Sequence, residues 1–285
     1  MEVIIKANAK INMGLNVLKK LPNGYHLLDM VMVPIDLSDK IKIKFLKNNG
    51  TLSITTNKKE IPTDKNNILY KIYEIFYMKS KLQKKAIYLH LEKIIPHEAG
   101  LGGGSSDGAA FLKALNTYHN DYFSNDQLEY ISLKIGADIP FFIKNIPSRV
   151  QRIGEKLVPL ENNLKEKIII VKPNFGISTK KAYESIGLGT KIKSANIDEI
   201  IEGMKLGNIN QIENSIVNQL EESLLNYEKN LGLLRKHLNN TGYKFFMSGS
   251  GSAYFAFVSP NTKEEDLKPL QTQLNNCKVC LCNFL

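Results

Sequence analysis

The chain has 285 residues, of which 43% are hydrophobic and 23% charged, a composition typical of a folded globular protein with a sizeable core. No apolar stretch approaches the roughly 20 residues that span a membrane. The first residues, MEVIIKANAK, also lack the apolar segment of a secretory signal. We therefore expect a cytoplasmic protein with no membrane partner.

The net charge of +10 would suit a nucleic-acid binder, but the kind of basic residue argues against one. Only three of the 38 basic residues are arginine, the side chain best suited to reading bases and clamping phosphates. The lysines are spread along the chain without a dominant block. We expect a solvated lysine-rich surface and no nucleic-acid partner, and a positive field of this kind helps to attract an anionic small substrate.

The first half of the chain alternates between strand and helix patterns. Residues 3–18 predict two short strands, the LPNGYH segment predicts a turn, and residues 40–47 and 51–56 alternate with the period of a strand. Apolar spacing predicts a helix over residues 66–80, a strand over 86–91 and a helix that ends near residue 119. A capped helix is expected from residue 124 to about 136, followed by a turn and a strand through IPFFI.

The second half begins afresh near residue 160, with a buried strand in EKIIIVKP. Three helices are expected between residues 196 and 239, followed by a strand-rich end. The three cysteines of the chain lie near the C-terminus: Cys277, Cys280 and Cys282. We interpret them as small apolar residues of a last strand rather than as ligands of a metal cluster. The whole chain predicts an α+β protein of two domains, residues 1–158 and 159–285.

The segment HEAGLGGGSSDGA lies between the expected strand at 86–91 and the helix after it. The lack of Cβ atoms at Gly100, Gly102, Gly103 and Gly104 allows backbone N–H groups to close around an anion. Ser105 and Ser106 would sit at the helix N-terminus with Asp107 in its first turn, and that end carries unpaired N–H groups and a positive dipole. The spacing fits neither a Walker A loop nor a dinucleotide fingerprint. The segment predicts a phosphate site rather than a slack loop.

Three segments, in the right order, resemble the motifs of the GHMP kinase superfamily. PHEAGLGGGSSDGAA resembles its phosphate-binding motif, and MSGSGSAYFAF resembles its third, glycine-rich motif. The opening ANAKINMGLNVLKKLPNGYHLLDM resembles that of members that phosphorylate a cytidine diphosphate derivative of methylerythritol, in the non-mevalonate route to isoprenoids. The resemblance spans essentially the whole chain. It implies a ribosomal protein S5 domain 2-like first domain, a ferredoxin-like second domain and an active site in the cleft between them.

The same resemblance implies an ATP-dependent kinase with Lys10 and Asp138 as its catalytic pair. Asp138 would take the proton of the acceptor hydroxyl, while Lys10 would orient Asp138 and favour the alkoxide. Mg²⁺ is implied because it accompanies ATP, with Ser106 as the candidate contact. Asn67 is the candidate on the adenine side. The expected ATP and phosphate contacts are Pro96, His97, Glu98, Ala99, Gly100, Leu101, Gly102, Gly103, Gly104, Ser105 and Ser106.

Substrate recognition is expected from a second group of residues. By resemblance, Tyr25 would stack on the cytosine, His26 would hydrogen-bond it, and Tyr183 would cover its other face. Asn12 would face the methylerythritol end, and Gly249 and Gly251 would support the phosphate loop and the substrate.

The chain departs from the family pattern at two of these positions. Tyr183 stands where relatives often carry phenylalanine, and tyrosine stacks as well. Glu98 places a carboxylate in the phosphate loop, where we expect it to face solvent.

Three other functions remain open at this point. A GHMP kinase for another alcohol, such as homoserine or mevalonate, would need no cytosine-stacking pair. A catalytically dead binding protein of the same fold would be expected to lose Lys10 or Asp138, and both are present. A lysine-rich nucleic-acid binder would show steeply salt-dependent association with an oligonucleotide.

Overall fold

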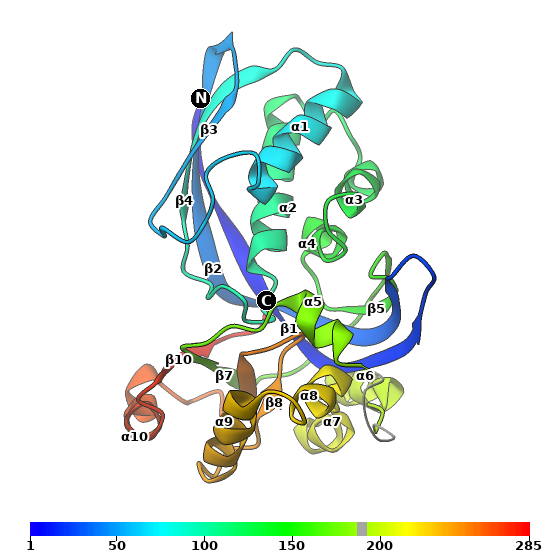
Figure 1. The fold of residues 1–285 in the computed structure, drawn as a ribbon, viewed down its shortest axis with the longest axis vertical. Coiled ribbons are helices and arrows are strands. Elements are labelled where there is room, and N and C mark those ends of the chain that lie inside the picture. Colours follow the sequence, from blue (N-terminus) through cyan, green and yellow to red (C-terminus); the bar gives the residue numbers. More distant parts are fainter. Residues whose placement is uncertain (187–192) are drawn as a thin grey trace. The chain divides into compact units, whose positions relative to one another are not determined.

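The computed structural model describes residues 1–186 and 193–285 and contains helices and two β-sheets (Figure 1), as the α+β class predicts. Its internal contacts group the chain into two compact units. Unit 1 comprises Met1–Ala9, Leu37–Ile95 and Gly102–Asn145, and unit 2 comprises Lys10–Asp36, Pro96–Leu101 and Ile146–Leu285. The units interleave along the sequence, and the division at residues 158 and 159 stays a prediction about domains.

Two long strands open the chain, β1 (Glu2–Lys20) and β2 (His26–Asn49). The prediction of two short strands over residues 3–18 was wrong, because β1 is one strand of 19 residues. Gly14 adopts a φ of +84° within it, a conformation that glycine tolerates without ending the strand. The strand also remains buried from Ala9 to Asn16, so no exposed residue marks a break.

In unit 1, β2 pairs antiparallel with β4 (Lys85–Glu92), which pairs in parallel with β3 (Leu52–Thr56). The alternation of lysine and isoleucine in β2 places Ile41 opposite Leu91 and Ile43 opposite Leu89, all four buried. The predicted strands at 40–47, 51–56 and 86–91 are therefore confirmed.

Four helices of unit 1 lie over one face of these strands (Figure 1): α1 (Ile68–Ser80), α2 (Gly103–Tyr118), α3 (Asn125–Leu133) and α4 (Ile139–Lys144). The capped helix is confirmed, since Ser124 and Gln127 form a capping box at the start of α3. The strand expected through IPFFI was wrong, because these residues form α4. Pro140 favours a helix start, and Asn145 ends the helix with a φ of 54°. A short buried apolar run fits either element, and here the flanking residues decide.

In unit 2, β2 also pairs with β5 (Ser148–Arg152), which pairs with β6 (Lys156–Pro159). A second sheet has the order β10-β7-β9-β8 and is antiparallel throughout: β7 (Lys167–Pro173), β8 (Phe246–Met247), β9 (Tyr254–Val258) and β10 (Cys277–Cys282). The buried strand in EKIIIVKP and the cysteine-containing last strand are confirmed, with Cys280 opposite Ile170 and all three thiols free.

Unit 2 contains four helices between residues 196 and 239, where three were predicted: α6 (Ile197–Leu206), α7 (Ile209–Ser215), α8 (Gln219–Leu224) and α9 (Lys229–Asn239). Asparagines divide the run, because Asn196, Asn208 and Asn218 each accept a backbone N–H at a new helix start.

The remaining helical segments are α5 (Thr179–Glu184), a short 3₁₀ turn (Glu264–Leu267) and α10 (Lys268–Gln273). None of the helices within residues 1–186 and 193–285 is long and apolar enough to cross a membrane.

Candidate active site

The glycine-rich segment enters helix α2 in unit 1. The helix begins at Gly103, with Gly102 as its N-cap at a φ of +71°. Ser105 and Ser106 are in its first turn, as predicted, but Asp107 is not, because the helix begins earlier than the serines suggested. A helix start leaves several N–H groups without intrahelical partners, which suits an anion.

Two neighbouring glycines at this helix start have different surroundings. A Cβ built on Gly103 would lie 3.0 Å from Cγ2 of Ile95 and 3.2 Å from Nζ of Lys93. Apart from the neighbouring backbone of its own helix, a Cβ built on Gly104 would meet no atom of the described structure within 4 Å. Gly103 therefore allows close packing, whereas Gly104 leaves open space over the backbone.

The preceding residues, Pro96–Leu101, belong to unit 2. They are held by the other glycine-rich motif, MSGSGSAYFAF, at residues 247–257. The carbonyl of Ala99 accepts the N–H of Ala253 at 3.1 Å, and Ser248 Oγ donates to the carbonyl of Gly100 at 3.1 Å. Gly100 has a φ of +71°, and a Cβ there would fall 1.9 Å from the carbonyl oxygen of Ser248. The two predicted motifs therefore lie against each other, and this part of the segment is not a slack loop.

Lys10 lies beside the same segment and is 3% exposed. Its Nζ donates to the carbonyl of Gly100 at 2.6 Å and to Oδ1 of Asn12. The backbone N–H of Asn12 donates to Ser248 Oγ at 3.3 Å. A Cβ on Gly249 would lie 2.9 Å from the lysine Nζ, so glycine leaves room for the ammonium group. Unit 2 thus brings together four of the predicted site residues.

The predicted cytosine-binding residues lie near a hairpin in unit 2. The turn is confirmed, with Gly24 at a φ of +87°, and it presents Tyr25 with 54% of its surface exposed. The rings of His26 and Tyr183 stack at a centroid distance of 5.1 Å. Burial, and then the charge of Lys20, lowers the pKa of His26, so its imidazole is neutral at pH 7. The structure brings His26 and Tyr183 together. The stacking of Tyr25 and Tyr183 on the cytosine and the hydrogen bonding of His26 to it stay predictions.

Two further candidates belong to unit 1. Asp138 is half-buried at the N-cap of α4 rather than before a strand, and its side chain makes no capping hydrogen bond. Asn67 is buried: its Oδ1 accepts the N–H of Leu69 at 2.8 Å and its Nδ2 donates to the carbonyl of Pro62 at 2.6 Å. Both ends of the Asn67 amide therefore hold the start of α1, and its role toward adenine stays a prediction. Glu98 is exposed, as expected.

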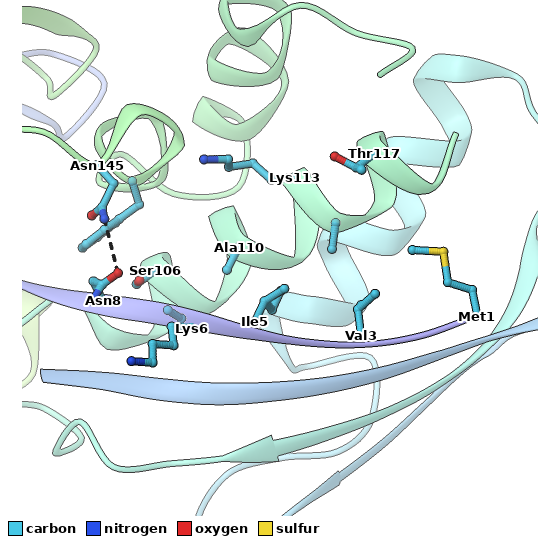
Figure 2. Close-up of a pocket in the computed structure, with 13 residues that line it drawn as sticks. Met1, Val3, Ile5, Lys6, Asn8, Ser106, Ala110, Lys113, Thr117 and Asn145 are labelled. Carbon is cyan, nitrogen blue, oxygen red and sulfur yellow. Dashed lines mark hydrogen bonds between the residues drawn. The ribbon is translucent and has the colours of Figure 1, made fainter. Parts of the chain in front are cut away.

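Unit 1 also contains a cavity of about 380 Å³ beside the first residues of β1 and helix α2 (Figure 2). Its walls are largely apolar, with Val3, Ile5 and Ala110 among them. At its polar end, Asn145 Nδ2 donates to Asn8 Oδ1 at 3.3 Å. Ser106 is the one predicted site residue in its lining, so this cavity does not gather the predicted ATP contacts.

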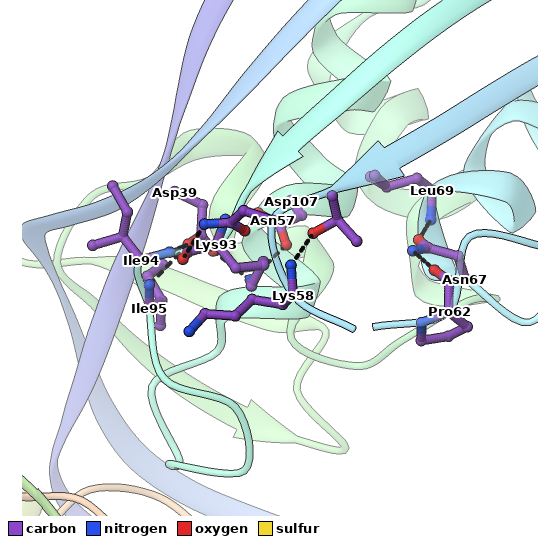
Figure 3. Close-up of polar contacts among 11 residues, drawn as sticks. Asp39, Asn57, Lys58, Pro62, Asn67, Leu69, Lys93, Ile94, Ile95 and Asp107 are labelled. Carbon is purple, nitrogen blue, oxygen red and sulfur yellow. Dashed lines mark hydrogen bonds and ion pairs between the residues drawn. The ribbon is translucent and has the colours of Figure 1, made fainter. Parts of the chain in front are cut away.

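A cluster of buried charges was missed from the sequence. Lys93 pairs with Asp39 and with Asp107, and all three side chains are buried (Figure 3). The available signal was a lysine inside the apolar run LEKIIP, where a charge is costly without a partner. No local pattern indicates which carboxylates supply that partner.

Comparisons with known proteins identify the family to which the glycine-rich segment belongs. Residues 67–145, which include this segment, match the model of the GHMP kinases N-terminal domain. A crystal structure of 4-(cytidine 5'-diphospho)-2C-methyl-D-erythritol kinase is similar with a TM-score of 0.81 and 25% identity, covering 99% of both chains. A homoserine kinase from Cytophaga hutchinsonii shares the fold, with a TM-score of 0.75 and 16% identity over 99% of this chain and 95% of its own. The two sheets and the glycine-rich helix start are thus those of a GHMP kinase.

Relatives in sequence identify the family within the GHMP kinases. The 4-diphosphocytidyl-2-C-methyl-D-erythritol kinase of Fusobacterium nucleatum is 46% identical over 284 residues, covering 99% of this chain and 97% of the relative. The kinase of the same name from Clostridium botulinum is 37% identical and covers 92% of each chain. The chain belongs to the family of 4-diphosphocytidyl-2-C-methyl-D-erythritol kinases.

Proposed function

We infer that the protein transfers the γ-phosphate of ATP to the 2-hydroxyl of 4-diphosphocytidyl-2-C-methyl-D-erythritol. The products are the 2-phosphate and ADP, and the reaction belongs to the methylerythritol phosphate route to isoprenoids. The observation that carries this proposal is the 46% identity to a kinase of that name along almost the entire chain. A panel assay tests it: ATP-dependent phosphorylation of several alcohols, including homoserine and mevalonate, with each product identified by mass.

Phosphoryl transfer asks the protein to align the phosphates, neutralise their charge and orient the acceptor hydroxyl. In this proposal Asp138 accepts the proton of the 2-hydroxyl as the oxygen attacks phosphorus. The Lys10 ammonium group stabilises the developing alkoxide. Support comes from the surroundings of each residue: Asp138 is not used as a helix cap, and Lys10 is held in place by Asn12 and Gly100.

The N–H groups at the start of α2 would hold the ATP phosphates, with Ser105 and Ser106 as additional donors. Mg²⁺ keeps several waters and usually takes only one or two protein ligands beside the phosphates. Within the described residues no three His, Cys, Asp or Glu side chains form a cluster that could cage a metal. The residues therefore fit a magnesium ion held mainly by ATP, with the Ser106 hydroxyl as a protein contact, and the bound ion would neutralise phosphate charge.

Gly104→Val tests the phosphate site without disturbing the packing of α2 on other elements, because within the described residues no atom outside the neighbouring backbone of α2 lies within 4 Å of the new Cβ. We expect the Kd for ATP, measured by calorimetry, to rise by about tenfold or more, since the side chain occupies the space of a phosphate. Gly232→Val is the matched control, because Gly232 also lies in a helix with open space around it. Equal ATP binding by both variants would place the phosphates elsewhere.

Tyr25→Ala tests recognition of the base. Stacking of a base on an aromatic ring contributes about 1–3 kcal/mol, so kcat/KM for the cytidine-linked substrate should fall by roughly tenfold to a hundredfold. The KM for ATP should not change. Tyr130→Ala, which removes another exposed tyrosine, is the control, and a matching loss there would contradict a specific role for Tyr25.

Free methylerythritol should be a very poor acceptor substrate of the wild-type enzyme. It lacks the cytidine diphosphate group, whose binding energy orients the hydroxyl.

A further inference from the structure

The buried charges around Lys93 join three elements of unit 1. Lys93 directly follows β4, and its Nζ contacts Asp107 Oδ2 on α2 at 2.7 Å and a carboxylate oxygen of Asp39 on β2. The other oxygen of Asp39 accepts the backbone N–H groups of Ile94 at 2.5 Å and Ile95 at 2.8 Å (Figure 3). One carboxylate therefore fixes the chain as it leaves β4, while the lysine links that point to α2.

The cluster is excluded from water. Asp39 is 0% exposed, Asp107 2% and Lys93 8%. Burial alone would lower the pKa of Lys93, but the charges of Asp107 and Asp39 outweigh it and raise the pKa, so the lysine stays charged. Burial raises the pKa of Asp107, and the Lys93 ammonium group opposes this rise. Buried charges of this kind are costly unless geometry and hydrogen bonds compensate, so their place in the structure needs a reason other than stability.

Their place relative to the glycine-rich segment supplies that reason. The chain leaves unit 1 after Ile95 and returns at Gly102, and the cluster holds both sides of this excursion. On the entry side, Asp39 binds the N–H of Ile95. On the return side, Lys93 Nζ binds Asp107 and would lie only 3.2 Å from a Cβ on Gly103. The first turn of α2 therefore rests directly on the lysine.

We propose that Lys93, Asp39 and Asp107 form a positioning cluster that sets where helix α2 begins and thereby places its N-terminal N–H groups for the ATP phosphates. The proposal rests on the proposed function, since ATP is the ligand that is positioned. The three side chains act through the backbone of Gly103–Ser106 and make no contact with the reacting atoms. Charged hydrogen bonds suit this role because they are directional, whereas apolar packing allows small shifts of the helix.

The test separates positioning from stability. In the double variant Lys93→Met/Asp107→Leu, apolar side chains replace one ion pair of the cluster, while Asp39 keeps its two backbone donors. We expect a lower thermal midpoint, because the buried carboxylate of Asp39 loses its counter-charge. Assayed well below that midpoint, the variant should show a Kd for ATP raised by roughly tenfold to a hundredfold and a KM for the alcohol within about twofold of the wild-type value. Asp107→Asn keeps an oxygen for Lys93 and should bind ATP much better than Asp107→Ala.

Asn116→Ala is the matched control, because Asn116 is a buried polar residue near the other end of α2 that bonds to the backbone of Phe123. It should lose stability and keep its Kd for ATP. Wild-type ATP binding by the folded double variant would overturn the proposal, as would an equal loss of binding in Asn116→Ala.

If the double variant does not fold, the comparison of Asp107→Asn with Asp107→Ala, each assayed well below its own thermal midpoint, decides in its place. Equal ATP affinities of that pair would overturn the proposal. Failure of the wild-type protein to bind ATP would instead refute the proposed function.

Discussion

Asp138→Asn is expected to lower kcat by about two to four decades, the usual contribution of a positioned acid–base group. The amide keeps the shape of the side chain but cannot accept the proton of the acceptor hydroxyl. The fold should persist, because the Asp138 side chain makes no capping hydrogen bond to α4. Single-turnover kinetics with the cytidine-linked substrate measures the chemical step, and circular dichroism checks the fold.

Asp126→Asn provides the control, since Asp126 also lies at the start of a short helix of unit 1. It should retain full turnover. Lys10→Ala should reproduce the loss seen in Asp138→Asn, because it removes the ammonium group that favours the alkoxide. If Asp138→Asn turned over at close to the wild-type rate, Asp138 would not be the base.

Of the single substitutions proposed for the glycine-rich segment, Gly100→Ala is expected to lower the free energy of unfolding the most. Its left-handed backbone alone disfavours alanine by about 1–2 kcal/mol. The new Cβ would also fall 1.9 Å from the carbonyl oxygen of Ser248 and 2.8 Å from the N atom of Gly251, so backbone must move. Overpacking typically adds about 1–3 kcal/mol, giving a loss in the free energy of unfolding of roughly 2–5 kcal/mol, measurable by urea denaturation.

Gly104→Ala, four residues further along the chain, is the control for Gly100→Ala. Its Cβ meets open space in the described structure and its backbone is helical, so stability should hold or rise by about 0.5–1 kcal/mol. Equal stability of Gly100→Ala and Gly104→Ala would mean that the two glycine-rich motifs do not pack as closely as the structure indicates.

Patterns within a few residues predicted most of the elements. Alternating lysine and isoleucine identified strand β2 through residues 40–47, and the capped helix expected from residue 124 is α3. Errors arose where a local pattern allowed two answers. The apolar run IPFFI suits a strand or a buried helix, and the stretch between residues 196 and 239 forms four helices where three were predicted.

The sequence by itself determined the class of protein, because a strand, a glycine-rich turn and a helix start need only neighbouring residues, and the motifs that resemble a family are equally local. Only the tertiary structure decided which distant residues meet. Ser248 donates to Gly100 across 148 positions, and Lys93 pairs with Asp39 across 54. Such partners depend on how the sheets and helices pack, and a buried lysine signals that it needs a carboxylate without indicating which one. For this reason the sequence could predict a phosphate site, while the buried charges of Lys93, Asp39 and Asp107 were found only in the folded protein.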